Sequence, residues 1–365
     1  MNTTKRRRLP AARTVTCAAV LAVVAAAASC GTDDKGPRPV PAIPHTSRGS
    51  CVLAGPDRCV TPPLTQAQAL AQIARYVQVN NRANALAYTG HLAQAGALNA
   101  TIETGPLRAQ SLAQYAELKV ETAAQKKTHH PFYYVHSTVY VPSQLPPGRA
   151  QLPYFFAVTH ESKYTVLLVF VEGVDRVWRN AAAIWTTGAS APSIAVDPQG
   201  YATAVDPDTD TLAMTPNQLP QAVNDNYITG GRGSGRQLAA TEVAKTDRTT
   251  ISGWNRALRP YVHAEALPDN DPYRAVWALK LTGGGALVIA SRMYDQHFNG
   301  IPQPGNGMGY IPIPPHSDAR TWVDEASSTN LAESYTCVDV AAIPPRGHGL
   351  TQQTGEDCEM VHAYG

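Results

Sequence analysis

The sequence predicts an α+β fold in two domains, each with N-terminal helices packed on a mainly antiparallel sheet. In each half, apolar residues at helical spacing come first and runs of alternating residues with short turns follow. No helical pattern lies between successive strands, and the order of helices and strands begins again near Thr215. Helices followed by strands are typical of α+β proteins rather than of parallel α/β sheets. We expect the domains to cover residues 65–205 and 214–365.

The first 29 residues have the composition of a secretory signal peptide. Lys5, Arg6, Arg7, Arg8 and Arg13 form a basic head, and an apolar run over residues 18–28 follows. This run is shorter than the 18 or more residues that a membrane-spanning helix needs. We therefore predict a cleaved targeting segment over residues 1–29.

The signal ends in small residues and a cysteine, Ala27-Ala28-Ser29-Cys30. This ending resembles the lipobox of bacterial lipoproteins, and the resemblance implies that the Cys30 thiol is diacylated, here with palmitate-type chains. Cys30 would then anchor the mature protein to the extracytoplasmic face of the cell membrane. Ordinary cleavage near the same place, with Cys30 as an unmodified thiol, stays open.

A proline-rich tether follows over residues 30–64. It contains few aliphatic residues and seven prolines among Gly, Ser, Arg and Asp. Such segments favour extended polyproline geometry. The folded part should therefore stand off the membrane.

Charge and composition limit the partners. The formal charge of +2 includes the five basic residues of the signal, and after their loss 25 basic and 28 acidic residues remain. A weakly acidic chain argues against nucleic acid, which needs a concentrated basic face. Because 44% of the residues are hydrophobic and 16% are charged, the chain can form real cores.

Four cysteines remain once Cys17 and Cys30 are set aside: Cys51, Cys59, Cys337 and Cys358. An even number in an oxidising compartment indicates disulfides. Closeness in sequence favours the local pairs Cys51–Cys59 and Cys337–Cys358, while the two other pairings would tie the ends of the chain together. The spacings match no zinc site of the two-residue-gap type.

In the first domain, Thr65 and Gln68 have the form of a capping box that starts a helix to about Ala87. Gly105-Pro106 starts a second helix. Alternation and short turns predict strands over Tyr133 to Val141, Tyr154 to Thr159, Thr165 to Val171 and Val174 to Trp185, and a hairpin over Ser193 to Val205. The apolar run Val166 to Val171 should be covered on both faces.

In the second domain, Thr215-Pro216 starts a helix and a further helix includes Ser252 to Leu258. The predicted strands are Ala275 to Leu281, Ala286 to Met293, Tyr335 to Ile343 and Glu359 to Ala363. This order of elements resembles the cystatin and nuclear-transport-factor class of folds. The whole arrangement resembles uncharacterised extracytoplasmic lipoproteins of high-GC Gram-positive (actinobacterial) bacteria, a resemblance that brings no catalytic residues with it.

Motifs for catalysis or metal binding are each incomplete. His160 to Tyr164 lacks the second histidine of a zinc protease, and Gly230 to Gln237 lacks the lysine and hydroxyl of a phosphate loop. Asp206, Asp208 and Asp210 alternate like calcium ligands, but the closing glutamate is missing. His129, His130 and His136 cluster only in sequence. We assign no metal ligand, cofactor or catalytic residue.

Aromatic residues in the strands are the remaining candidates for a pocket, among them Tyr133, Tyr134, Trp178 and Trp185. We expect a lipid-anchored extracytoplasmic binding or interaction protein without catalytic activity, with an unknown protein or small molecule as partner and ligand-binding residues unassigned. An enzyme with a pocket on the same scaffold stays open. So does the solute-binding component of a transporter.

Overall fold

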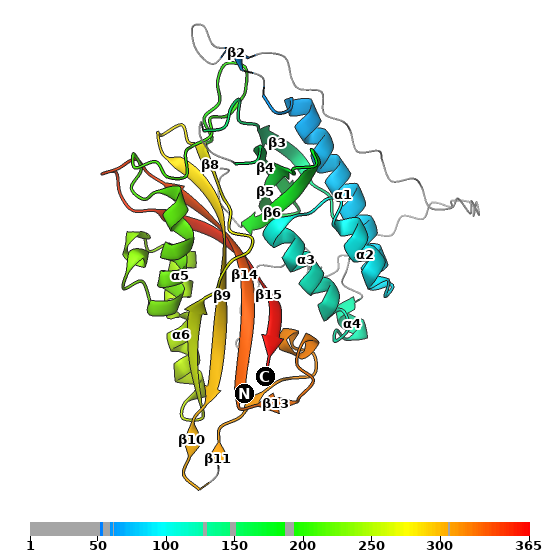
Figure 1. Cartoon of the computed structure of the whole chain (residues 1–365), viewed down its shortest axis with the longest axis vertical. Coiled ribbons are helices and arrows are strands. Elements are labelled where there is room, and N and C mark those ends of the chain that lie inside the picture. Colours follow the sequence, from blue (N-terminus) through cyan, green and yellow to red (C-terminus); the bar gives the residue numbers. More distant parts are fainter. Residues whose placement is uncertain are drawn as a thin grey trace, which may run out of the picture.

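The computed structural model describes residues 52–53, 59–60, 62–126, 130–146, 151–186, 193–305 and 307–365. It consists of helices and antiparallel sheets, which confirms the predicted α+β class (Figure 1). The signal, Cys30, Cys51 and most of the tether lie outside the described residues. Among the described helices, none combines the length and the apolar character needed to span a membrane.

Four helices form the outer layer of the N-terminal half: α1 (Gln66–Tyr88), α2 (Leu92–Asn99), α3 (Gly105–Glu117) and α4 (Ala123–Lys126). The predicted capping box starts α1, because the Gln68 amide donates to Thr65 Oγ1 at 3.2 Å and the Thr65 amide donates to Gln68 Oε1 at 2.8 Å. The predicted start of α3 is also confirmed. Helix α2, rich in Ala and lacking a cap, was not predicted.

The first sheet contains β3 (Val135–Tyr140), β4 (Tyr154–Glu161), β5 (Tyr164–Glu172) and β6 (Trp178–Thr186). They pair antiparallel in the order β3-β4-β5-β6. Central strand β5 is covered on both faces, as its apolar run predicts. Phe155 and Leu168 face α1, while Phe156 and Val169 belong to the core on the other face.

Two predicted strands of this sheet need correction. The strand predicted over Tyr133 to Val141 begins only at Val135, which is exposed, and its start is irregular because His136 has a positive φ of 53° and the register shifts between Val135 and Thr138. The strand predicted from Val174 begins only at Trp178. Val174 and its neighbours form the turn between β5 and β6, and Val174 is 91% exposed.

The second sheet contains β7 (Val262–Pro268), β8 (Val276–Lys280), β9 (Ala286–Gly300), β14 (Asn330–Ile343) and β15 (Gln352–Tyr364). The order is β15-β14-β9-β7, and β8 also pairs with β9. Helices α5 (Leu219–Thr229) and α6 (Glu242–Leu258) cover one face. All four predicted strands exist, but β9, β14 and β15 extend well past their predicted ends.

Short elements complete the chain. They are the strands β1 (Val52–Leu53), β2 (Cys59–Val60), β10 (Pro302–Gln303), β11 (Gly307–Met308), β12 (Ile311–Pro312) and β13 (Ser327–Ser328), and the 3-10 helices η1 (Pro216–Gln218), η2 (Ser234–Gln237) and η3 (Asp318–Thr321). Element η1 leads into α5 at the predicted Thr215-Pro216 start.

The two sheets pack against each other through a common core. Phe156 and Val169 of the first sheet belong to the same buried cluster as Leu279, Ile289 and Val340 of the second. The layers are therefore helix, sheet, sheet and helix. The division into domains at residues 205 and 214 stays a prediction.

A hairpin over residues 193–205 joins both sheets. Its predicted turn is present, since the Gly200 amide donates to Asp197 O at 2.9 Å. Ala202 then bonds to Val141 at the end of β3, and Val205 bonds to Ala278 in β8. This segment extends the contact between the two halves.

The structure contains the disulfide Cys337–Cys358. The two residues lie opposite each other on the antiparallel pair β14 and β15, with an S–S distance of 2.00 Å. Because Cys51 lies outside the described residues, the pair Cys51–Cys59 stays a prediction.

Candidate functional site

A cleft lies where α1, α3, one end of the first sheet and strand β15 meet. It encloses a cavity of about 40 Å³. Its lining residues are Tyr76, Asn80, Leu107, Gln110, Ser111, Gln114, Phe132, Tyr134, Trp185 and Asp357. Junctions between structural units of this kind are frequent positions of ligand sites.

The aromatic side of the cleft is held by hydrogen bonds from neighbouring elements. Asn81 of α1 donates to Phe132 O at 2.9 Å and accepts from the Phe132 amide at 3.1 Å. Trp185 Nε1 donates to Glu161 Oε2 at 2.8 Å. The rings of Phe132 and Tyr134 pack with centroids 5.0 Å apart, and both contact the Tyr76 ring. These rings are therefore fixed in place before any ligand binds.

Helix α3 supplies the opposite, polar wall. Gln110 Nε2 donates to the backbone oxygens of Thr336 at 3.3 Å and Asp357 at 3.1 Å. Within the described part of the chain, its buried Oε1 atom has no hydrogen-bond partner. One turn further on, Gln114 Nε2 donates to Glu359 Oε2 at 2.7 Å. Helix α3 is thus tied to β14 and β15 while one amide oxygen stays available.

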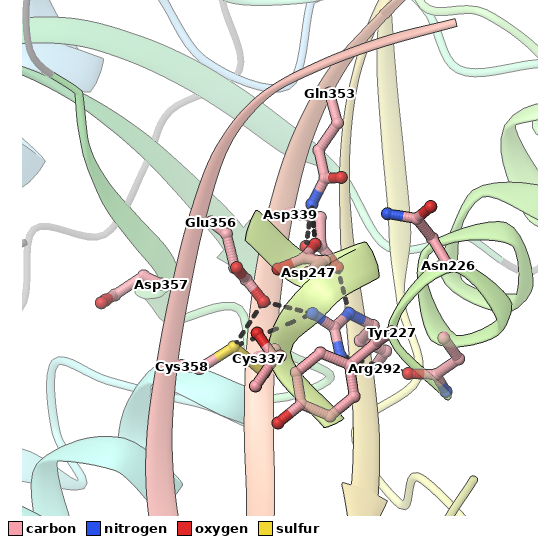
Figure 2. Close-up of polar contacts among 12 residues, drawn as sticks. Asn226, Tyr227, Asp247, Arg292, Cys337, Asp339, Gln353, Glu356, Asp357 and Cys358 are labelled. Atoms are coloured by element: carbon pink, nitrogen blue, oxygen red, sulfur yellow. Dashed lines mark hydrogen bonds and ion pairs between the residues drawn. A yellow bond between two sulfur atoms is a disulfide. The ribbon is translucent and has the colours of Figure 1, made fainter. Parts of the chain in front are cut away.

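Asp357 is the acidic group of the cleft. Its side chain projects from the opposite side of β15 to Glu356 (Figure 2). The carboxyl group makes no hydrogen bond or ion pair with another described residue. Burial, together with the nearby charges of Glu359 and Glu356, raises the pKa of Asp357 to about 8. At neutral pH this carboxyl group is therefore largely protonated.

A chain of buried polar groups runs behind the cleft along α1. Tyr76 Oη and Asn80 Nδ2 both donate to Glu103 Oε1, at 3.0 and 2.7 Å. Asn84 Nδ2 donates to Asn80 Oδ1 at 2.6 Å, and Tyr115 Oη donates to Asn84 Oδ1 at 3.0 Å. Burial, with the charge of Glu103, raises the pKa of Tyr76 well above its usual value. Tyr76 is therefore neutral at physiological pH.

A second polar cluster lies on the other side of β15, between the sheet and α6 (Figure 2). At its centre is Arg292, which is 1% exposed. Its Nε donates to Asp339 Oδ2 at 2.8 Å, Nη2 pairs with Glu356, and Nη1 donates to Asn224 Oδ1 at 3.2 Å. The charges of these acids raise the pKa of Arg292 despite its burial. The guanidinium therefore stays charged.

Asp247 of α6 adds a third acid to this cluster. Gln353 Nε2 donates to both Asp247 Oδ2 and Asp339 Oδ1 at 3.2 Å. Burial and the charge of Glu356 raise the pKa of Asp247 to about 9, and burial raises the pKa of Asp339 to about 6 although Arg292 opposes this. One guanidinium cannot neutralise three carboxylates, so the cluster retains a proton. Its members bind one another, which indicates a structural role.

Three sulfur and oxygen groups could in principle hold a metal, namely Cys337, Glu356 and Cys358, whose ligand atoms lie within 4.8 Å of one another. Both sulfur atoms form the disulfide. Thiolates are the ligands that soft metals need, and the oxidised pair supplies none.

The incomplete motifs found in the sequence lie outside the cleft and outside the Arg292 cluster. His160 and Tyr164 flank the turn between β4 and β5, as predicted. In the glycine-rich loop, the amides of Gly233 and Gly235 each donate to Asp225 Oδ2 at 2.8 Å. A carboxylate of the chain itself therefore takes the position that a phosphate would need.

The alternating aspartates and the histidine cluster of the sequence also form no common site among the described residues. Asp208 accepts from Asn217, and Asp210 pairs with Arg346 at 3.5 Å in an exposed loop. His129 lies outside the described residues, and the exposed His130 and His136 do not line the cleft.

Sequence reasoning named some cleft residues but missed the acid. Tyr134 and Trp185 were among the pocket candidates, and the structure brings them together. Tyr133 is 67% exposed and Trp178 packs in the core with α1. Asp357 was missed because the last strand was predicted only from Glu359, which placed this acid in a loop.

Comparisons with known proteins identify relatives without a known activity. Residues 60–365 match a family described as Domain of unknown function (DUF8094). An uncharacterized lipoprotein of Streptomyces coelicolor is 28% identical over 371 residues, which cover 99% of this chain and 96% of that protein. No solved structure matches significantly. The predicted resemblance to uncharacterised actinobacterial lipoproteins is thereby confirmed.

Proposed function

The chain belongs to the family described as Domain of unknown function (DUF8094), and from this premise we propose that it is a lipid-anchored extracytoplasmic binding protein without catalytic activity, whose ligand site is the cleft at Asp357. The lipobox at Cys30 and the name of the Streptomyces relative both support the anchor. The membrane is then one partner, through lipid, and a small molecule is the other.

A single observation carries the binding site. Asp357 lines a cavity together with rigid aromatic rings and amide groups, yet its carboxyl group bonds to no other described residue. A titratable group with a perturbed pKa in a cleft marks a candidate functional site. The buried Gln110 Oε1 atom has no partner among the described residues, and buried polar groups are normally hydrogen-bonded. A ligand that bonds to the half-buried Asp357 and to this oxygen would satisfy it.

Binding is favoured over catalysis by the composition of the lining. General acid–base chemistry commonly uses two titratable groups with different pKa values. Besides Asp357, the lining contains only two phenols that titrate, those of Tyr76 and Tyr134. The raised pKa of Tyr76 makes it a poor base.

The anchor is tested at Cys30. Wild-type protein expressed in an actinobacterial host should be processed and should partition into the detergent phase of a Triton X-114 extract. The Cys30→Ala variant should stay unprocessed or appear in the aqueous phase. A Cys30→Ala protein that is processed and still membrane-bound would refute lipidation.

The cleft is tested by filling it. The Gln114→Trp variant places a large ring in the lining, while Arg108→Trp places the same ring on an exposed position of the same helix. Compounds from a panel of small charged and neutral metabolites should raise the melting temperature of wild-type and Arg108→Trp protein but not of Gln114→Trp. Stabilisation that survives in Gln114→Trp would remove the site from this cleft, and steady consumption of a stabilising compound would favour an enzyme.

A further inference from the structure

We propose that the ligand of this cleft is a small organic cation, an amine or alkylammonium group, which sits against the aromatic rings with the Asp357 carboxylate as its counter-ion. This inference rests on the proposed function and names the chemical class of its ligand.

The aromatic content of the lining supports a cation. Four of the ten lining side chains carry aromatic rings, those of Tyr76, Phe132, Tyr134 and Trp185. Cations are attracted to the faces of such rings, with Trp and Tyr the strongest, and aromatic cages recognise quaternary ammonium groups. Because Asn81 and Glu161 hold Phe132 and Trp185 in place, the cage loses little conformational entropy when it binds.

Acids line the cleft or bond to its lining, among them Asp357, Glu359 and Glu103. Among the lining residues the only ionisable charge near neutral pH is the Asp357 carboxyl group, and no Lys or Arg is present. Glu359 bonds to the lining residue Gln114, and Glu103 bonds to the lining residues Tyr76 and Asn80. An anion would be repelled by the acid of the lining and by the acids that bond to the lining. A cation would instead meet a favourable field.

The size of the cavity limits the ligand to a small head group. One water molecule needs about 10–15 Å³ of such space, so about 40 Å³ holds a few waters or one compact group. A methylated ammonium group is of this order. A nucleotide or a sugar chain is too large to enter whole.

Release of the Asp357 proton on binding distinguishes a cationic ligand from a neutral one. Without ligand, burial keeps Asp357 largely protonated at neutral pH. The titratable groups around it are Glu359 on its own strand, Glu356 on the opposite side of that strand, and the phenols of Tyr76 on α1 and Tyr134 before β3. A bound cation stabilises the carboxylate, so its apparent affinity should rise by about tenfold per pH unit below pH 8 and then level off. A neutral ligand that accepts the Asp357 proton would show the opposite trend.

The experiment compares a cation with its neutral isostere. Calorimetry on the full-length mature protein in nonionic detergent would use choline and 3,3-dimethyl-1-butanol as probes at pH 6, 7, 8 and 9. Choline should bind more tightly as the pH rises, and near pH 7 its heat should depend on the ionisation enthalpy of the buffer. The neutral alcohol should bind at least tenfold more weakly at pH 8.

Two variants localise the effect. Asp357→Asn should abolish choline binding and its pH dependence, whereas the same exchange at an exposed acid outside the lining, Asp324→Asn, should keep both. Melting temperatures establish that each variant is folded. The cation assignment is wrong if the alcohol binds as tightly as choline, if affinity falls as the pH rises, or if Asp357→Asn binds choline like wild type. The proposed binding function itself fails if no compound of the wider panel stabilises the folded protein.

Discussion

Arg292 is the residue whose surroundings constrain the fold most strongly. It lies on β9, buried between the second sheet and α6, and its guanidinium bonds to Asp339 of β14, Glu356 of β15 and Asn224 of α5. Removing one member of a buried ion pair leaves the other charges without compensation, which is more costly than losing an exposed pair. The network therefore links three neighbouring strands of the second sheet.

We predict that Arg292→Met lowers the free energy of unfolding by about 3–5 kcal/mol, because Asp339 and Glu356 would lose their cation inside the protein. The matched control is Arg346→Met, which removes the partner of Asp210 in a pair whose two side chains are exposed and should cost less than about 1 kcal/mol. Urea unfolding monitored by circular dichroism measures both. Equal, small losses in the two variants would show that the cluster does not stabilise the fold.

At the residue scale, sequence reasoning could find partners that lie close along the chain but not partners that strand register brings together. Cys337 and Cys358 could be paired because a hairpin was predicted between them. Arg292 and Asp339 come from β9 and β14, and their contact depends on a register that no turn between neighbouring strands fixes. Asp357 was missed for a related reason. Because β15 was predicted to begin only at Glu359, the side of the strand on which Asp357 lies was not identified.

At the scale of elements, β15 depends on its neighbours. It is an edge strand of the second sheet, and edge strands expose unpaired backbone groups. Helix α3 bonds to it through Gln110 and Gln114, and the disulfide joins it to β14. Because Asp357 belongs to this strand, whatever holds β15 also holds the cleft.

We predict that the double variant Cys337→Ser/Cys358→Ser loses about 3 kcal/mol of stability, from the loop-closure entropy of a bond with a sequence separation of 21. The corresponding Cys51→Ser/Cys59→Ser variant should lose less, since it changes only the end of the tether. Differential scanning calorimetry without reductant compares them. A larger loss in the N-terminal variant would mean that the tether contributes more to the fold than β15 does.

The helices predicted most accurately were those with both a signal for the helix start and apolar residues at helical spacing. Helix α1 had a capping box and an apolar face, and α3 had Gly105-Pro106 at its start. Helix α2 lacked both signals, because it is short, rich in small residues and has no capping side chain. The start of α6 was missed although Thr241 caps it, with its Oγ1 accepting from the Ala244 amide at 3.2 Å. Local propensity is a weak signal when tertiary packing decides whether a helix forms.

At the scale of the whole molecule, the two sheets share one core. The apolar run of β5 predicted that both of its faces are covered, but the sequence pattern does not identify the elements that cover them. One face meets α1, and the other meets β8, β9 and β14 of the second sheet. Tyr154 Oη also donates to Ala278 O at 2.8 Å across this junction. Because this face is buried in a core that both halves share, we expect the two halves to unfold together, although the sequence of each half resembles a complete α+β unit.

We predict that the two halves unfold in one cooperative transition. Ile289 lies in β9 and is fully buried in the shared core, so Ile289→Ala should cost about 2–5 kcal/mol. If the halves are coupled, hydrogen exchange should accelerate by similar factors in β14 of its own sheet and in β5 of the other. The control Leu267→Ala, on an exposed position of β7, should change exchange in neither strand. Faster exchange in β14 with β5 unchanged would show two independently stable domains, and the shared core would then be an interface between them rather than a condition of folding.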